Sequence, residues 1–177
     1  MKSMELLLKD SKIDLVPSKE ENILKVFMDK QDITLAIREP HISKNVSQVS
    51  SHKGVRDIMT VKQRNLAENK NGVVMDGRDI GTVVFPNADI KIFLTASVEE
   101  RAKRRLKEQL NKGIESKLDE LIQEISKRDE QDINREIAPL KAAEDSIEVD
   151  TTNLTYDQVL SKLIEIANKY QEKFLKV

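Results

Sequence analysis

The sequence predicts an α/β fold in which helices flank a parallel β-sheet. Three short apolar segments, 73–75, 90–95 and 146–150, have the length and composition of buried strands. Amphipathic helices are predicted after the second and the third, and such alternation is typical of parallel sheets covered by helices. The chain has 177 residues, 38% of them hydrophobic and 34% charged, which suits one domain of ordinary size.

The overall composition argues against several kinds of partner. The 30 basic and 31 acidic residues nearly cancel, so no bulk positive charge favours nucleic acid. No apolar run approaches the roughly 18 residues of a membrane span, so no membrane association is predicted. The chain has no cysteine, which excludes disulfides and thiolate metal sites and is typical of a reducing cytoplasm. Its two histidines are too few for a histidine-rich metal site.

The N-terminal half is predicted to be mainly helical, with one hairpin. Residues 1–9 form a short helix with no N-cap residue before it. Residues 25–37 form two short strands around a polar turn at Asp29–Asp32. Residues 41–53 and 54–70 then form two further helices, the second with an apolar stripe at helical spacing.

In the C-terminal half, capping boxes mark the starts of three helices. The paired residues are Ser97 with Glu100, Ser116 with Asp119, and Thr155 with Gln158. Gly113 ends the first of these helices. Asp150, at the end of the predicted strand 146–150, is open to three interpretations: a turn, an N-terminal helix cap, or a contact to a nucleotide base. The cap is the default interpretation.

A dense polar motif lies in VVMDGRDIGTVVFP, residues 73–86, between two apolar runs. One interpretation is a tight turn with a solvated salt bridge. The other is a ligand site in which Arg78 binds a phosphate through its planar guanidinium and Asp79 accepts from a sugar hydroxyl or a base amine. Open α/β sheets bind ligands at the carboxyl ends of their strands, and Asp76 to Asp79 follow the predicted strand 73–75.

Arginines recur elsewhere in a way that favours phosphate recognition. Arg128 and Arg135 lie seven residues apart, so on a continuous helix both would point the same way. Arg56 lies near the start of its predicted helix. A solvated charged surface remains the alternative, but arginine in place of lysine favours planar recognition of phosphate oxygens. A second cluster on the helix after residues 90–95 comprises Arg101, Arg104 and Arg105.

Taken together, these residues make the chain resemble a bacterial cytidylate kinase, a P-loop nucleoside monophosphate kinase. The resemblance covers nearly the whole chain, within a single domain of residues 1–177. It implies a small antiparallel insert in the monophosphate-binding region, at about residues 20–70, and a lid region at about residues 100–140. The matching segments are SQVSSHKGVRD (47–57), DGRDIGTVVFPNADIKIFL (76–94), ERAKRR (100–105), ISKRDEQDINREIAPL (125–140) and VDTTNLT (149–155).

The resemblance also implies an activity, because this family transfers the terminal phosphate of ATP to CMP or dCMP with Mg²⁺. Ser47 and Arg56 resemble contacts to the cytosine. Arg78 and Asp79 resemble the pair that binds the monophosphate and its sugar. The implied partners are therefore small nucleotides, without nucleic acid or membrane.

The lid region is implied to supply further site residues. Arg128 and Arg135 resemble lid arginines that bind CMP and reach the transferring phosphates, and Arg104 matches an arginine on the ATP side of the lid. The implied catalytic residues are Asp79, Arg128 and Arg135. The resemblance implies no metal ligand in the chain itself, and a cytoplasmic monomer.

One family motif is missing from these residues. The family has a phosphate loop, G-x-x-x-x-G-K-[S/T], directly after its first strand, but none of the five glycines here is followed by lysine. The resemblance therefore implies an N-terminally truncated form without the first strands, expected to fold poorly and to show little kinase activity alone. The alternatives are a non-catalytic remnant that binds pyrimidine nucleotide, a truncated gene product without function, and a helical interaction protein whose arginines only line its surface.

Overall fold

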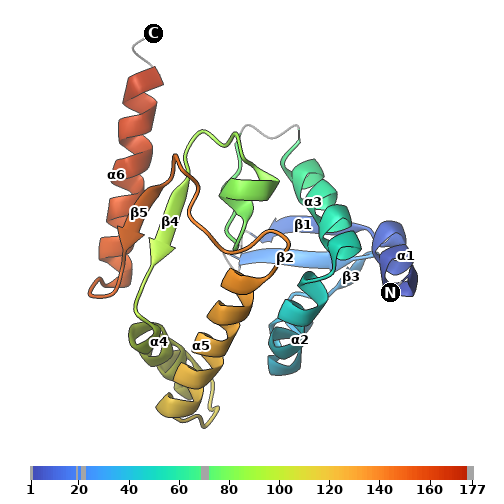
Figure 1. Cartoon of the computed structure of the whole chain (residues 1–177), viewed down its shortest axis with the longest axis horizontal. Coiled ribbons are helices and arrows are strands. Elements are labelled where there is room, and N and C mark those ends of the chain that lie inside the picture. The colour runs from blue at the N-terminus through green and yellow to red at the C-terminus, as the bar shows by residue number, and fades with distance from the viewer. Residues whose placement is uncertain (1, 19, 21–22, 69–71, 175–177) are drawn as a thin grey trace. The chain divides into compact units, whose positions relative to one another are not determined.

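In the computed structural model, which describes residues 2–18, 20, 23–68 and 72–174, the chain forms two compact units (Figure 1). The first unit comprises Met1–Phe85 with Asn134–Pro139, and the second comprises Pro86–Ile133 with Leu140–Val177. Among the helices described, none is long and apolar enough to cross a membrane.

The first unit contains a three-stranded antiparallel sheet of order β1-β2-β3. β1 (Ile13–Ser18) pairs with β2 (Ile23–Met28), which pairs with β3 (Gln31–Asp32). Asp29 and Lys30 connect β2 to β3 with φ angles of 51° and 70°. A two-residue loop with both φ angles positive matches the right-handed twist of a hairpin. A hairpin therefore forms in the predicted segment, but β3 lies within the predicted turn at Asp29–Asp32, and residues 33–37 do not form the predicted second strand.

Two features of this sheet differ from the prediction. β3 is only two residues long, because Asp32 accepts a hydrogen bond from the Thr34 amide at 2.9 Å and the chain turns away. β1 was not predicted, since its sequence IDLVPS contains a proline and little alternation. Pro17 is tolerated there because β1 is an edge strand, where a missing amide donor breaks no internal ladder.

Helices complete the first unit and agree with the predicted ones to within three residues at each end. They are α1 (Lys2–Asp10), the 3₁₀ turn η1 (Ala36–Arg38), α2 (Pro40–Ser50) and α3 (Lys53–Ala67). The short turn η1 was not predicted. Proline suits the first turn of α2, where its absent amide has no helical partner. α3 contacts α1, α2 and β1 and buries Val55, so it is the central helix of this unit.

The predicted strand at residues 73–75 is wrong, because none of the described strands pairs with this segment. Val73 is half exposed and Val74 fully exposed. An apolar run becomes a strand only where its backbone groups find a partner. The chain instead forms a single π-helical turn, η2 (Ile80–Val84), which buries Val84 against α3. Asp79 thus precedes a π turn instead of following a strand.

The second unit contains the predicted parallel pair of strands. β4 (Ile92–Thr95) and β5 (Ile147–Asp150) pair in register from Ile92 with Ile147 to Thr95 with Asp150. Three helices accompany them: α4 (Val98–Asn111), α5 (Leu118–Asn134) and α6 (Tyr156–Phe174). The α/β class with a parallel sheet is therefore confirmed (Figure 1).

Local capping explains where two of these helices begin. Before α4, the Ser97 hydroxyl accepts from the Glu100 amide at 3.2 Å. Before α6, the Thr155 hydroxyl accepts from the Gln158 amide at 3.3 Å, while the Thr155 amide donates to the Gln158 side chain at 2.8 Å. The second pair is a complete capping box, as predicted.

α4 and α5 pack together as a helical hairpin with its own apolar core. Ala102 is completely buried, and Leu121 and Ile125 are nearly so. The partly buried residues packed against them are Val98, Leu106, Leu118 and Ile122. The two apolar stripes meet at Ala102 and Leu106 of α4, whereas Leu110, farther along the same stripe, is 57% exposed.

Asp150 resolves as a turn residue, so the default interpretation as a helix cap is wrong. Its carboxylate accepts from the Thr152 amide at 2.9 Å and from the Thr152 hydroxyl at 2.5 Å. These hydrogen bonds, the hydroxyl first, lower the pKa of Asp150. The helix that follows is capped by Thr155 instead, since Asp150 is already engaged in closing the turn.

A lysine beside the parallel strands gives a testable pH dependence. The Lys91 ammonium contacts both carboxylate oxygens of Asp145, at 2.8 and 2.7 Å, and also the Pro86 carbonyl. The hydrogen bond from Lys91 lowers the pKa of Asp145 below its ordinary value of 3.8. Because the pKa of Asp145 is lower in the folded state, the Lys91–Asp145 pair stabilises the fold fully at any pH above the unfolded-state pKa of Asp145. That stabilisation is lost as pH falls through the folded-state pKa.

We expect Lys91→Met to raise the pKa of Asp145 towards 3.8, measured by carboxyl ¹³C NMR titration. We also expect Asp145→Asn to lower the free energy of unfolding at neutral pH, by an amount that shrinks as pH falls through the folded pKa of Asp145. A wild-type Asp145 that titrates at or above 3.8 would contradict this assignment.

Candidate functional site

Within the first unit, the carboxylate of Asp79 lies between two guanidinium groups. The Arg56 Nη2 atom donates to Asp79 Oδ2 at 2.5 Å. The Arg135 Nη2 atom lies 3.7 Å from Asp79 Oδ1. The three side chains are only 12%, 12% and 9% exposed for Arg56, Asp79 and Arg135. We call these three residues the Asp79 cluster.

Backbone carbonyls hold the two arginines in place. Arg56 lies in the first turn of α3, and its Nη1 donates to the carbonyl of Ser50, the last residue of α2, at 2.9 Å. The Nε of Arg135 donates to the Ala138 carbonyl at 2.6 Å. Ala138 has a φ of 50°, which is uncommon for a residue other than glycine. Arg135 is therefore held by a loop whose backbone is locally strained at Ala138.

The continuous-helix argument for Arg128 and Arg135 is wrong, because α5 ends at Asn134. The Asp132 carbonyl accepts from the Leu140 amide at 2.7 Å, so the chain leaves the helix before Arg135. Arg135 belongs to the first unit together with Asp79. Arg128 belongs to the second unit, where its Nε lies 3.9 Å from an oxygen of the buried Asp132.

The charge balance around the Asp79 cluster favours an anionic ligand. Arg78 precedes Asp79 directly and is exposed to solvent. Arg56 and Arg135 set two positive charges against the one negative charge of Asp79. Guanidinium groups bind phosphate oxygens through planar, paired hydrogen bonds. Because two of them are largely withdrawn from water, a phosphate here would be screened little by salt.

The remaining predicted site residues lie elsewhere. Ser47 is part of α2, but its side chain lies outside the residues described. Arg104 donates to the Thr151 carbonyl at 2.5 Å and to the Glu100 carboxylate at 3.2 Å, so it joins α4 to the turn after β5. Its neighbours Arg101 and Arg105 form ion pairs with Asp129 and Glu124 of α5. Both pairs join α4 to α5, so for these two arginines a structural role is the better interpretation.

Sequence reasoning missed one arginine that contacts the π turn after Asp79. Arg64, in the last turn of α3, donates through Nε to the Val84 carbonyl at 2.8 Å and through Nη2 to the Val83 carbonyl at 2.9 Å. It lies eight residues after Arg56 on the same helix, and that spacing is its one sequence signal. Its hydrogen-bond partners are backbone carbonyls, and a pattern of side chains in the sequence cannot predict such contacts.

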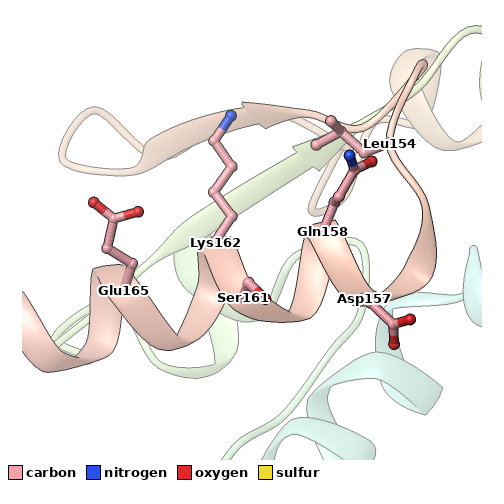
Figure 2. A pocket seen from close by; sticks show the side chains of 6 residues that line it. All are labelled: Leu154, Asp157, Gln158, Ser161, Lys162 and Glu165. Carbon is pink, nitrogen blue, oxygen red and sulfur yellow. The ribbon is translucent and has the colours of Figure 1, made fainter.

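The described part of the chain contains no group of three or more His, Cys, Asp or Glu side chains that could hold a metal ion. An open pocket lies on the surface of α6, at the end of the turn that follows β5 (Figure 2). Its lining residues are Leu154, Asp157, Gln158, Ser161, Lys162 and Glu165.

Comparison with known proteins identifies the family. The family model described as cytidylate kinase matches residues 2–169. A cytidylate kinase of Bacillus licheniformis is 51% identical over 171 residues, which cover 97% of this chain and 75% of the relative. A cytidylate kinase of Geobacillus sp. is 50% identical over 92% of this chain and 71% of its own length. One of Bacillus subtilis is 50% identical over 90% of this chain and 70% of the relative.

These similarities first define a class of enzyme, the nucleoside monophosphate kinases, to which an α/β fold with a parallel sheet and helices is well suited. More particularly, the chain belongs to the cytidylate kinase family, the ATP:CMP phosphotransferases.

Proposed function

We propose that this chain binds CMP or dCMP as phosphoryl acceptor at the Asp79 cluster, with ATP as the donor. The observation that supports this proposal is the carboxylate of Asp79 held between Arg56 and Arg135, with Arg78 next to it in the chain. The carboxylate accepts from a sugar hydroxyl or from the amine of the base. The guanidinium groups of Arg78 and Arg135 bind the 5′-phosphate and balance its charge, and Arg56 contacts the cytosine, as the family resemblance implies.

In the proposed reaction, an oxygen of the CMP 5′-phosphate attacks the terminal phosphorus of ATP, and the bond from that phosphorus to the ADP oxygen breaks. Phosphoryl transfer requires positioning and charge neutralisation more than covalent help from the protein. Arg56 and Asp79 orient the acceptor. Arg135 neutralises charge on the transferring phosphate.

Further site residues are proposed from the family resemblance. We assign a cytosine contact to Ser47, and a role at the transferring phosphates, alongside Arg135, to Arg128. Arg104 is assigned to the ATP side. Mg²⁺ would enter bound to the phosphates of ATP and neutralise their charge, consistent with a cofactor that arrives with its nucleotide.

We further propose that these 177 residues bind the acceptor better than they catalyse transfer. They contain no G-x-x-x-x-G-K-[S/T] motif, whose backbone amides and lysine would cradle the donor phosphates. The alternatives remain a polypeptide that binds pyrimidine nucleotide without transferring phosphate, and a gene product without function.

Isothermal titration calorimetry of the 177-residue chain tests the acceptor site. We expect CMP to bind at least about tenfold more tightly than UMP or AMP, a difference of about 1.4 kcal/mol. Titration with dCMP then shows whether the site prefers a ribose or a deoxyribose nucleotide. Equal affinity for all monophosphates, or no heat with CMP, would refute the acceptor assignment.

A coupled assay for ADP separates binding from catalysis. With CMP, ATP and Mg²⁺, we expect ADP production by the 177 residues to be far below that of the Bacillus subtilis cytidylate kinase measured in parallel. Comparable rates for the two proteins would leave the acceptor site in place and overturn the proposal of poor transfer.

A further inference from the structure

The segment of residues 79–84 is hydrogen-bonded to α3 at both of its ends. At its start, Asp79 is bonded to Arg56 in the first turn of α3. At its end, the carbonyls of Val83 and Val84 accept from Arg64 in the last turn of α3. The two arginines are eight residues apart, or about 12 Å along the helix axis. α3 thus spans the whole π turn.

The π turn links these two attachments through its backbone. The Asp79 carbonyl accepts from the amides of Val83 at 2.9 Å and Val84 at 3.2 Å, and the Ile80 carbonyl accepts from Phe85 at 2.7 Å. A movement of residues 83–85 would therefore shift the backbone of Asp79. The last carbonyls of a helical turn have no partner within it, and Arg64 supplies donors to two of them.

From these contacts we propose that Arg64 is a positioning residue for nucleotide binding. By holding the end of the π turn, it sets the backbone of Asp79 so that the carboxylate meets Arg56 and Arg135. This inference rests on the proposed function of the Asp79 cluster. Arg64 itself touches only backbone carbonyls among the contacts described, so its effect on the ligand passes through Asp79.

The test compares Arg64→Met with Lys62→Met. Lys62 is a matched control because it lies on the same helix and also donates to a backbone carbonyl, that of Ser11, at 2.6 Å. Its partner lies outside the π turn. We expect Arg64→Met to weaken CMP binding about five- to tenfold, the loss of up to two hydrogen bonds from a charged donor. Lys62→Met should destabilise the first unit without changing CMP affinity.

Two further measurements separate positioning from general stability. Arg64→Lys retains one charged donor of the two, so it should restore part of the CMP affinity that Arg64→Met loses. Hydrogen exchange of the Val83, Val84 and Phe85 amides needs no ligand. We expect Arg64→Met to speed their exchange about tenfold relative to Lys62→Met, because the turn opens locally.

The outcomes are distinguishable. If wild type binds CMP and Arg64→Met binds it equally well, or if Lys62→Met weakens binding as much, the positioning role is refuted. If wild type does not bind CMP, the proposed function itself fails. In that case, exchange of the three amides still shows whether Arg64 holds the π turn, and unchanged exchange would refute that as well.

Discussion

Asp79→Asn is expected to reduce CMP binding at least about 100-fold and to destabilise the first unit by about 3 kcal/mol. The carboxylate is the negative group between Arg56 and Arg135, and all three side chains are largely buried. An amide keeps the shape but loses the charge, so two guanidinium groups would remain close together in a site with little water. Removal of one member of a buried ion pair is costly because the other charge stays buried.

Urea unfolding and CMP calorimetry measure the two effects. Asp57→Asn is the matched control, since Asp57 lies on α3 next to Arg56 and pairs with Lys53 at 2.6 Å, but both of these side chains are well exposed. Exposed pairs contribute about 0.5 kcal/mol or less. Equal losses in the two variants would show that the Asp79 cluster has no special role.

Leu121→Ala is expected to destabilise the second unit by about 3 kcal/mol, the usual cost of a cavity left by a buried leucine. Leu121 is 4% exposed and packs with Ala102 and Ile125 between α4 and α5. These helices carry Arg104 and Arg128, two of the proposed site residues. Loss of the hairpin core would therefore affect the elements on which the proposed donor-side contacts lie.

Thermal and urea unfolding of Leu121→Ala and Leu110→Ala give the comparison. Leu110 lies on α4 but is 57% exposed, so its truncation leaves no cavity and should change stability by about 0.5 kcal/mol or less. A similar loss in both variants would contradict the assignment of Leu121 to the core of the hairpin.

Helix positions and local turns followed from the sequence because short-range interactions determine them. The Thr155 and Gln158 capping box forms as its spacing predicts, and at α4 the Ser97 hydroxyl forms half of its predicted box. The hairpin of β2 and β3 lies where a polar turn interrupts apolar residues. Each of these features depends on atoms only a few residues apart.

Errors arose where a segment needed a distant partner. The apolar residues 73–75 indicated a strand, but among the described strands none pairs with them. Arg128 and Arg135 were assigned to one face of one helix, but the Leu140 amide takes the Asp132 carbonyl and α5 ends first. Periodicity reports which face of a helix would be buried, but not where a tertiary hydrogen bond ends the helix.

The sequence by itself determined the family, through motifs spread over nearly the whole chain, and the candidate residues of the site. The tertiary structure alone decided that Asp79 binds Arg56, 23 positions earlier in the chain, and lies beside Arg135. It also decided that Arg64 donates to the carbonyls at the end of the π turn that follows Asp79. The physical reason is the distance along the chain over which each kind of interaction acts. Propensity and capping act within a turn or two, whereas a buried ion pair forms only where packing brings distant segments together and removes water from both charges.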